Sequence, residues 1–191
     1  MRPEIADAIL WVIWLASWIV AARWSDPAAQ RTAAGEAVSY RAATVVGALV
    51  LFFGDRAFFP GAQLWSAGGG VKWILVLVVA LSLAFTWWAR IYLGRLWSSS
   101  VTKKADHRVV DTGPYAIVRH PIYTGLIAAV WATAVLKGNA VAILGVLLMT
   151  WGFWLKARLE ERFLREQLGA EAYDSYRRRV PMLAPFGPTS G

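Results

Sequence analysis

Apolar residues in this chain gather into five long stretches that are separated by polar segments. They cover about residues 5–22, 42–53 with further apolar residues up to 59, 71–93, 121–136 and 140–155. A helix that crosses the hydrocarbon core of a bilayer needs about 20 predominantly apolar residues. The pattern therefore predicts an all-α membrane protein with five transmembrane helices, the fourth of them short.

The first stretch carries three tryptophans, Trp11, Trp14 and Trp18, at spacings of three and four residues. Residues at these spacings lie on one face of a helix. The pattern leaves open whether this face contacts a neighbouring helix or lipid. No small-residue cleavage site follows the stretch, so we expect a retained helix rather than a signal peptide.

Only three residues, Lys137-Gly138-Asn139, separate the fourth stretch from the fifth. A connection this short predicts an antiparallel helical hairpin. The start of the fourth helix and the end of the fifth then lie on the same side of the membrane. We therefore expect His120 and Glu160 at the same level, although they are far apart along the chain.

After residue 155 the chain becomes polar. Charged residues alternate with apolar ones, which indicates a C-terminal amphipathic helix that lies at the membrane interface or covers a site. The basic run Arg177-Arg178-Arg179 is more typical of contact with anionic lipid headgroups than with a substrate.

Basic residues distinguish the two sides of the predicted bundle. With five spans, segments 23–41, 94–120 and 155–191 share one side and hold most of the Lys and Arg residues. The other side holds little beyond Arg2, Arg56, Lys72 and Lys137. Basic loops stay in the cytoplasm, so the side with segment 94–120 is expected to be cytoplasmic.

Composition narrows the class of protein further. Hydrophobic residues make up 58% of the 191 positions, with 12 Trp, against about 45–50% apolar residues in soluble domains. The absence of Cys excludes disulfides, thiolate metal sites and a Cys nucleophile. The run Gly68-Gly69-Gly70 follows no strand, so we interpret it as a loop and not as a dinucleotide-binding turn.

The most polar part of this apolar sequence is the segment 107–125, HRVVDTGPYAIVRHPIYTG. Pro121 suits the first turn of a helix, where its missing N–H has no consequence. The amides of residues 122–124 would then lack intrahelical partners. With Arg119 and His120 before them, they would form a site for a carboxylate or phosphate. The alternative is an interface loop whose basic residues contact lipid headgroups.

Two blocks of residues resemble the signature of a family of integral-membrane methyltransferases. The first is Gly113-Pro114-Tyr115 with Arg119-His120-Pro121-Ile122-Tyr123-Thr124-Gly125, and the second is Glu160-Glu161, Leu168-Gly169, Tyr173, Tyr176 and Val180-Pro181. In this order, with one helical hairpin between them, they are similar to isoprenylcysteine carboxyl methyltransferases and bacterial phospholipid N-methyltransferases. The resemblance covers about residues 95–186.

The resemblance implies one integral-membrane domain over residues 1–191. Residues 1–93 would form a three-helix N-terminal part, and residues 94–186 would bind S-adenosyl-L-methionine and carry out catalysis. The residues that the resemblance assigns to the cofactor are His107, Val110, Gly113, Tyr115, Arg119, His120, Pro121, Tyr123, Gly125, Glu160 and Glu161. Catalytic roles fall on Glu160, Lys156 and Arg158, and no metal ligand is implied.

Two of these roles have alternatives in the residues themselves. His120 either caps the helix start or contacts the donor, and the resemblance favours the contact. Tyr115 and Tyr123 are interface aromatics or, by the resemblance, line the cofactor pocket, where an aromatic face suits a sulfonium.

The adjacent glutamates are unusual at the end of a membrane helix, where a carboxylate is costly unless it is solvated or paired. Adjacent helical residues point about 100° apart. We therefore expect one of Glu160 and Glu161 to face the site. The other would face solvent or pair with a nearby arginine, that is, with Arg158, Arg162 or Arg165.

One position departs from the family pattern. In the isoprenylcysteine enzymes that the sequence resembles, an Arg one turn before the glutamate meets the substrate, and here that position is Lys156, with Arg158 close by. Lys cannot grip a carboxylate with two parallel hydrogen bonds as Arg does. This departure argues against a prenylcysteine acceptor.

The predicted function is methyl transfer from S-adenosyl-L-methionine to a lipophilic acceptor at the cytoplasmic face of a prokaryotic plasma membrane. The expected partners are that substrate and membrane lipids, and not nucleic acid. Methyl transfer from a sulfonium is an in-line displacement that needs no metal. The alternatives are a methyltransferase for a small thiol or amine, and a non-catalytic membrane protein that retains the fold.

Overall fold

A computed structural model of the protein describes residues 1–24, 30–31, 34–57, 63–94, 102–103 and 109–189. The main helices are α1 (Pro3–Ala21), α2 (Ala34–Ala57), α3 (Gly69–Leu93), α4 (Pro121–Lys137), α5 (Ala140–Leu168) and α6 (Ala170–Arg179). The short elements are η1 (Ala22–Trp24), η3 (Gly113–Ala116) and the strands β1 (Gln30–Arg31) and β2 (Thr102–Lys103). The helical fold class predicted from the sequence is confirmed.

Four of the described helices are long and apolar enough to cross a membrane. They are Pro3–Ala21, Ala37–Asp55 within α2, Gly69–Leu93 and Ala140–Leu168. The fifth predicted span is α4, which is apolar but has only 17 residues. The chain is thus a multi-pass membrane protein with four candidate spans and one shorter apolar helix.

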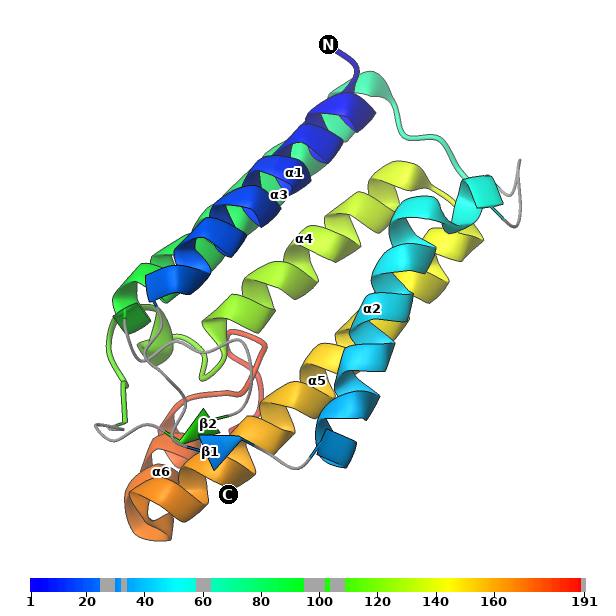
Figure 1. The fold of residues 1–191 in the computed structure, drawn as a ribbon. Coiled ribbons are helices and arrows are strands. Elements are labelled where there is room, and N and C mark those ends of the chain that lie inside the picture. The colour runs from blue at the N-terminus through cyan, green and yellow to red at the C-terminus, as the bar shows by residue number, and fades with distance from the viewer. Residues whose placement is uncertain (25–29, 32–33, 58–62, 95–101, 104–108, 190–191) are drawn as a thin grey trace.

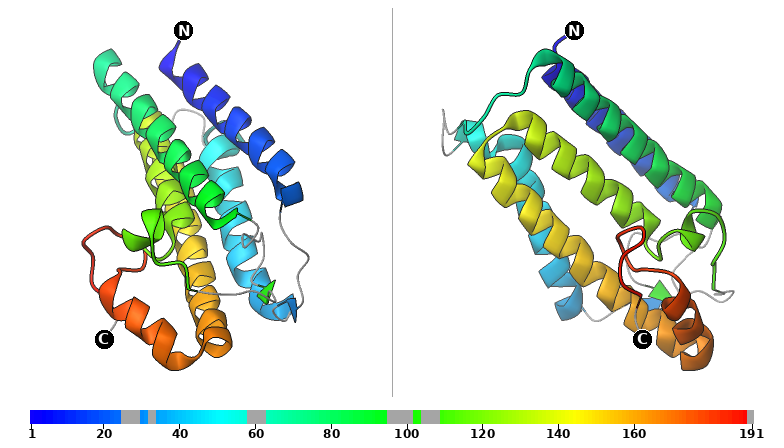
Figure 2. Two further views of the ribbon diagram at one scale, coloured as in Figure 1. Left: turned by 90° about the vertical axis from the view of Figure 1, so that its left-hand side faces the viewer. Right: turned by 180° about the vertical axis from the view of Figure 1, so that it is seen from behind.

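The helices pack as two pairs with α4 between them. In Figures 1 and 2, α1 lies beside α3, α2 lies beside α5, and α4 runs between the two pairs. Much of the main hydrophobic core lies on α4, including Ala129, Val130 and Ala134, each at most 1% exposed. The central position of α4 is why a helix of only 17 residues organises the bundle.

Glycines bring α2 and α5 into close contact. A Cβ on Gly145 would lie 2.5 Å from the backbone nitrogen of Leu51, and one on Gly152 would lie 2.5 Å from Oγ1 of Thr44. Small residues allow membrane helices to approach closely and gain van der Waals contact.

The tryptophan face of α1 contacts neighbouring helices rather than lipid. The indole N–H of Trp14 donates to Oγ1 of Thr86 on α3 at 2.8 Å. The indole N–H of Trp11 donates to Oγ1 of Thr133 on α4 at 2.9 Å, and the Thr133 hydroxyl donates to the buried Asp7 carboxylate at 2.9 Å. Asp7 is therefore a partnered carboxylate that fastens α1 to α4.

The α4–α5 connection is the predicted antiparallel hairpin. Gly138 has φ of 67°, in the left-handed region that favours glycine, and ends α4. The Asn139 side chain accepts a 2.7 Å hydrogen bond from the amide of Ala142 and caps α5.

Two sequence expectations about helix starts are wrong. The second helix begins at Ala34 and not near residue 42, because its polar first turns pack Ala37 and Tyr40 against Leu159 of α5. Gly69 and Gly70 belong to the first turn of α3 and not to a loop. A glycine in the exposed first turn disturbs little, which is why the run did not interrupt the helix.

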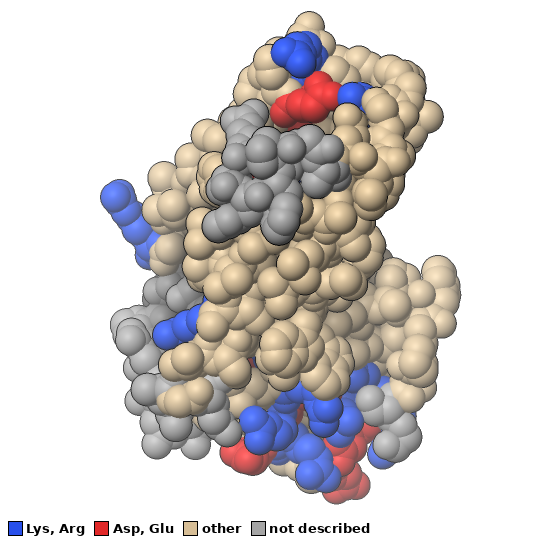
Figure 3. Space-filling view, turned by 90° about the vertical axis from the view of Figure 1, so that its right-hand side faces the viewer, with Lys and Arg blue, Asp and Glu red and all other residues tan. Residues whose placement is uncertain are grey.

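One end of the bundle gathers the connections that follow α1 and α3. Strands β1 and β2 pair antiparallel with Gln30 opposite Lys103, and α6 lies at the same end (Figure 1). Figure 3 shows most of the visible charged side chains near this end and a largely uncharged surface above it. The charged residues of the bundle are therefore concentrated at this end.

Candidate active site

The site begins at the start of α4. Pro121 occupies the first turn, as the sequence predicted, and His120 is the N-cap residue, although its side chain makes no capping hydrogen bond. The anion cradle expected from the amides of residues 122–124 is only partly present, because the Thr124 N–H already donates to the His120 carbonyl at 3.0 Å.

The two adjacent glutamates of α5 meet His120 there. Nδ1 of His120 lies 3.4 Å from Oε2 of Glu160, and Nε2 lies 3.4 Å from Oε1 of Glu161. The expected common level of His120 and Glu160 is confirmed. The expectation that one glutamate faces away is wrong. Adjacent side chains on a helix point about 100° apart, and the imidazole lies between these two directions and reaches both carboxylates.

Glu160 also accepts a hydrogen bond from Tyr123, one turn into α4. The phenol oxygen lies 2.5 Å from Oε1 of Glu160, and the Tyr123 ring stacks on His120 with centroids 5.5 Å apart. The Glu160 side chain nevertheless stays 21% exposed. It can therefore still accept a hydrogen bond from a bound ligand.

Lys156 lies one turn before the glutamates, between two aromatic rings. Its Nζ is 5.2 Å from the ring centroid of Tyr123 and 5.7 Å from that of Tyr40 on α2. The Tyr40 hydroxyl is buried and has no hydrogen-bond partner within the described part of the chain. Tyr40 was missed by sequence reasoning, since nothing local to an aromatic at a helix end shows which helix it will face.

Apart from His120, Glu161 has different partners from Glu160. Nε of Arg119 donates to it at 2.7 Å, and Nε of Arg177 lies 3.5 Å from its other oxygen. The glutamate pairs predicted for Arg158 and Arg165 are not found in the described part of the chain, where Arg158 lies over the Trp154 ring. Arg165 instead pairs with Asp174 of α6 at 2.9 Å.

Charge and burial act in opposite directions on His120. Burial lowers the pKa of the imidazole, but the carboxylates of Glu160 and Glu161 together outweigh it and raise the pKa above the ordinary value. The folded protein therefore favours an imidazolium between two carboxylates. Burial, and then the charge of Glu160, raise the pKa of Tyr115.

The remaining predicted site residues are spread around this cluster. Tyr115 is buried, and its carbonyl accepts a hydrogen bond from the Tyr176 hydroxyl at 2.7 Å. Gly113 has φ of 58°, and a Cβ there would lie 2.6 Å from the Tyr92 ring. Val110 is half-buried, and His107 lies outside the described residues.

Two predicted residues face elsewhere. Gly125 packs against α3, where a Cβ would lie 2.7 Å from Cγ2 of Thr86, so its small size serves helix packing. Arg158 is exposed, with its guanidinium 4.8 Å from the Trp154 ring centroid. The structure therefore does not bring Arg158 together with Glu160 and Lys156.

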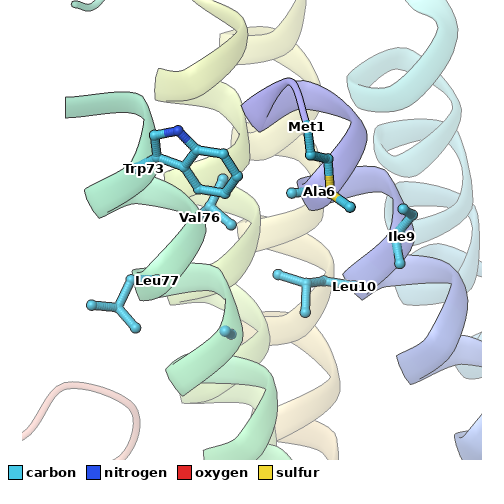
Figure 4. Close-up of a pocket in the computed structure, with 8 residues that line it drawn as sticks. Met1, Ala6, Ile9, Leu10, Trp73, Val76 and Leu77 are labelled. Atoms are coloured by element: carbon cyan, nitrogen blue, oxygen red, sulfur yellow. The ribbon is translucent and has the colours of Figure 1, made fainter. Parts of the chain in front are cut away.

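Within the described ranges, no group of His, Cys, Asp or Glu side chains is arranged to hold a metal ion. An apolar groove of about 390 Å³ lies between α1 and α3 at the opposite end of the bundle. Figure 4 shows Leu10 of α1 and Val76 of α3 along its walls. Its lining includes no charged side chain, so the polar cluster around His120 remains the candidate site.

The helices and this cluster define a multi-pass helical membrane protein with a buried ionic site at one end. The model of the isoprenylcysteine carboxyl methyltransferase (ICMT) family matches residues 73–166, which contain α4 and both glutamates. This match confirms the resemblance to the ICMT family that the sequence predicted, and it supports the prediction of a membrane methyltransferase.

Named relatives agree with this assignment. Protein-S-isoprenylcysteine O-methyltransferase of Schizosaccharomyces pombe is 36% identical over 103 residues, which are 52% of this chain and 43% of that protein. Protein-S-isoprenylcysteine O-methyltransferase B of Arabidopsis thaliana is 26% identical over 140 residues, 71% of this chain and 68% of that protein. A methanethiol S-methyltransferase of Pseudomonas sp. is 42% identical over 71 residues, 37% of this chain and 26% of that protein. The chain thus spans less than half of two of these three relatives.

Proposed function

We propose that the protein transfers a methyl group from S-adenosyl-L-methionine to a lipophilic acceptor that reaches the site from the bilayer. The observation that carries the proposal is the partly exposed carboxylate of Glu160, held by His120 and Tyr123 inside the segment that matches the family. The partly exposed oxygens of this carboxylate can accept further hydrogen bonds, and the donor offers an ammonium group and ribose hydroxyls.

The residues of the cluster fit such a donor. Glu160 would accept from its ammonium or ribose, and the buried Tyr40 hydroxyl has a free donor within the described part of the chain. When bound, the donor supplies an activated methyl group on a sulfonium. The protein then has to hold donor and acceptor in line and exclude water, which can account for about 7–11 kcal/mol of barrier.

The chemistry of the acceptor follows from Lys156 and from the relatives. Lys156 presents a single ammonium beside Tyr40 and Tyr123, which does not reproduce the bidentate grip of an Arg on a carboxylate. We therefore favour a lipophilic acceptor other than a prenylcysteine. A small thiol is the second candidate, favoured by the similarity to methanethiol S-methyltransferase.

We further infer five spans, with the site at the cytoplasmic face of a prokaryotic plasma membrane. An α4 of 17 residues is about 26 Å long at 1.5 Å per residue, against about 30 Å for the hydrocarbon core. A shortfall this small is accommodated by local thinning and by snorkelling of flanking residues. Residues 1–93 would then support the cofactor-binding part formed by residues 94–186.

Calorimetric titration of the purified protein in detergent with S-adenosyl-L-methionine and its demethylated product tests the proposal. Glu160→Gln keeps the size of the side chain and removes its charge. Since a charge-assisted hydrogen bond contributes about 1.5–3 kcal/mol, donor affinity should fall by about one to two decades.

Glu166→Gln is the matched control, because Glu166 is an exposed carboxylate on the same helix. It should bind the donor like the wild type. No donor binding by the wild type would refute the function, and equal affinity of the Glu160 and Glu166 variants would remove Glu160 from the site.

A further inference from the structure

The segment after α6, residues 180–183, lies along the start of α4, and we call it the strap. Its carbonyls accept from the amide of Arg119 at 2.9 Å (Pro181) and from the amide of His120 at 3.1 Å (Met182). The carbonyl of Leu183 accepts from the Thr124 hydroxyl at 2.6 Å. The strap is therefore fixed against the same residues that begin the site.

The guanidinium of Arg119 joins the strap to the cluster. The side chain is 1% exposed, and its Nε donates to Glu161 at 2.7 Å. Its Nη1 donates to the carbonyl of Arg177 at 3.0 Å and to that of Val180. One side chain thus connects α5, the end of α6 and the strap.

We propose that Arg119 is a positioning residue that fixes Glu161 against His120 and holds the strap over the start of α4. This inference rests on the proposed function and deepens it. Sequence motifs alone place Arg119 among the groups that touch the cofactor. The structure instead directs its Nε and Nη1 donors to protein acceptors.

The shape of arginine explains why this position needs it. A planar guanidinium offers several N–H groups in fixed directions, so one residue can satisfy a carboxylate and two carbonyls at once. The carbonyl of Arg177 belongs to the last turn of α6, where a cation is favoured by the helix dipole, and Val180 is the C-cap residue that follows it. A lysine keeps the charge but not these directions.

Through Glu161 and His120, Arg119 also affects the position of Glu160. The imidazole contacts both carboxylates at 3.4 Å, so an anchored Glu161 fixes the ring from one side and presents it to Glu160 on the other. If Glu161 moves away, the imidazolium loses one of its two carboxylates. His120 should then release its proton at lower pH.

The test compares Arg119→Lys with Arg165→Lys. Arg165 also pairs with a carboxylate, that of Asp174 on α6, but its side chain is exposed. NMR titration of protein labelled at histidine would follow the His120 ring without any ligand, and calorimetry would follow donor binding. Thermal melts would show that each variant is folded.

We expect Arg119→Lys to lower the titration midpoint of His120 and to weaken donor binding about tenfold, while Arg165→Lys changes neither. A folded Arg119→Lys with an unchanged midpoint would overturn the inference. Weaker donor binding without a shift of the midpoint would also overturn it, since Arg119 would then act on the donor directly.

Two further measurements keep the outcome decisive. If Arg119→Lys does not fold, Glu161→Asp is titrated in its place, because the shorter side chain draws the carboxylate back from Arg119 and His120 and keeps both charges. The titration midpoint of His120 should fall in this variant as well, and an unchanged midpoint would count against the inference. Absence of donor binding by the wild type would refute the proposed function, and the His120 titration would still decide the role of Arg119.

Discussion

His120 is the residue that joins the start of α4 to the two glutamates of α5. It stands at the N-cap position of α4, its ring stacks on Tyr123, and its two nitrogens each lie 3.4 Å from one of two adjacent carboxylates on α5. A neutral imidazole there would leave two negatively charged carboxylates close together without a positive charge between them. The protonation of His120 is therefore part of the stability of the folded protein.

This coupling predicts how stability depends on pH. The folded pKa of His120 is raised above the unfolded value of about 6.5. Its contribution is thus fully present below about pH 6.5 and is lost as the pH rises through the folded pKa, at up to about 1.4 kcal/mol per pH unit. The difference in melting temperature between the wild type and His120→Gln should therefore shrink as the pH rises from 6 to 9.

The variant itself provides the control for this measurement. The chain has only two histidines, and His107 is retained in both proteins, so its titration cancels in the comparison. A difference that stays constant or grows with pH would show that His120 is not charged in the folded state.

Some of these contacts could be foreseen from the sequence and some could not. The meeting of His120 with Glu160 follows from the three-residue turn between α4 and α5, since the turn fixes which helix ends coincide. The partner of Glu161 does not follow, because it depends on the rotation of α5 about its axis. The role of Tyr40 depends on how α2 packs, which no local pattern reveals.

At the scale of elements, the α2–α5 contact depends on glycine more than on large apolar side chains. The Cβ of an alanine at position 145 would lie 2.5 Å from the nitrogen of Leu51 and 2.8 Å from the carbonyl of Gly47. Both are backbone atoms, which cannot rotate away. The helices would have to separate, and the contacts along their whole interface would loosen.

Gly145→Ala should therefore destabilise the protein by about 1–3 kcal/mol, as overpacking does in well-packed cores. Gly70→Ala is the matched control, because it lies in the first turn of α3 with nothing within 4 Å of its Cβ. Since alanine favours a helix over glycine by up to about 1 kcal/mol, this control should be neutral or stabilising. Denaturation in mild detergent measures both, and a stabilising Gly145→Ala would contradict the close packing of α2 on α5.

For the whole molecule, hydrophobic patterning predicted the number and order of the long helices but not their pairing. Five apolar stretches correspond to α1 to α5, because burial in lipid or in the bundle requires apolar residues in either case. The packing of α1 on α3 includes single hydrogen bonds such as that from Trp14 to Thr86. Such contacts carry no periodic signal, so the arrangement of the pairs could not be predicted.

The arrangement of the whole molecule predicts its topology in the membrane. The starts of α1 and α3 lie at one end, and α6 lies toward the other, as does the start of α4 (Figure 1), where His120 and its partners form the polar cluster. Most basic residues follow α1, α3 and α5, and basic loops stay in the cytoplasm. A reporter fused after Gly191 should therefore be cytoplasmic, whereas one inserted between Ser66 and Ala67, before α3 begins, should face the opposite side.

A third fusion isolates the short helix α4, on which the count of five depends. If α4 crosses the bilayer, a reporter fused after Gly138 lies on the same side as the insertion at residues 66–67. Its end is held there in the structure, since the Gly138 carbonyl accepts from the amide of Leu64 at 2.8 Å. If α4 does not cross, the Gly138 fusion becomes cytoplasmic and the Gly191 fusion moves to the opposite side. That result would replace five spans by four and would place Glu160 away from the cytoplasmic pool of any soluble donor.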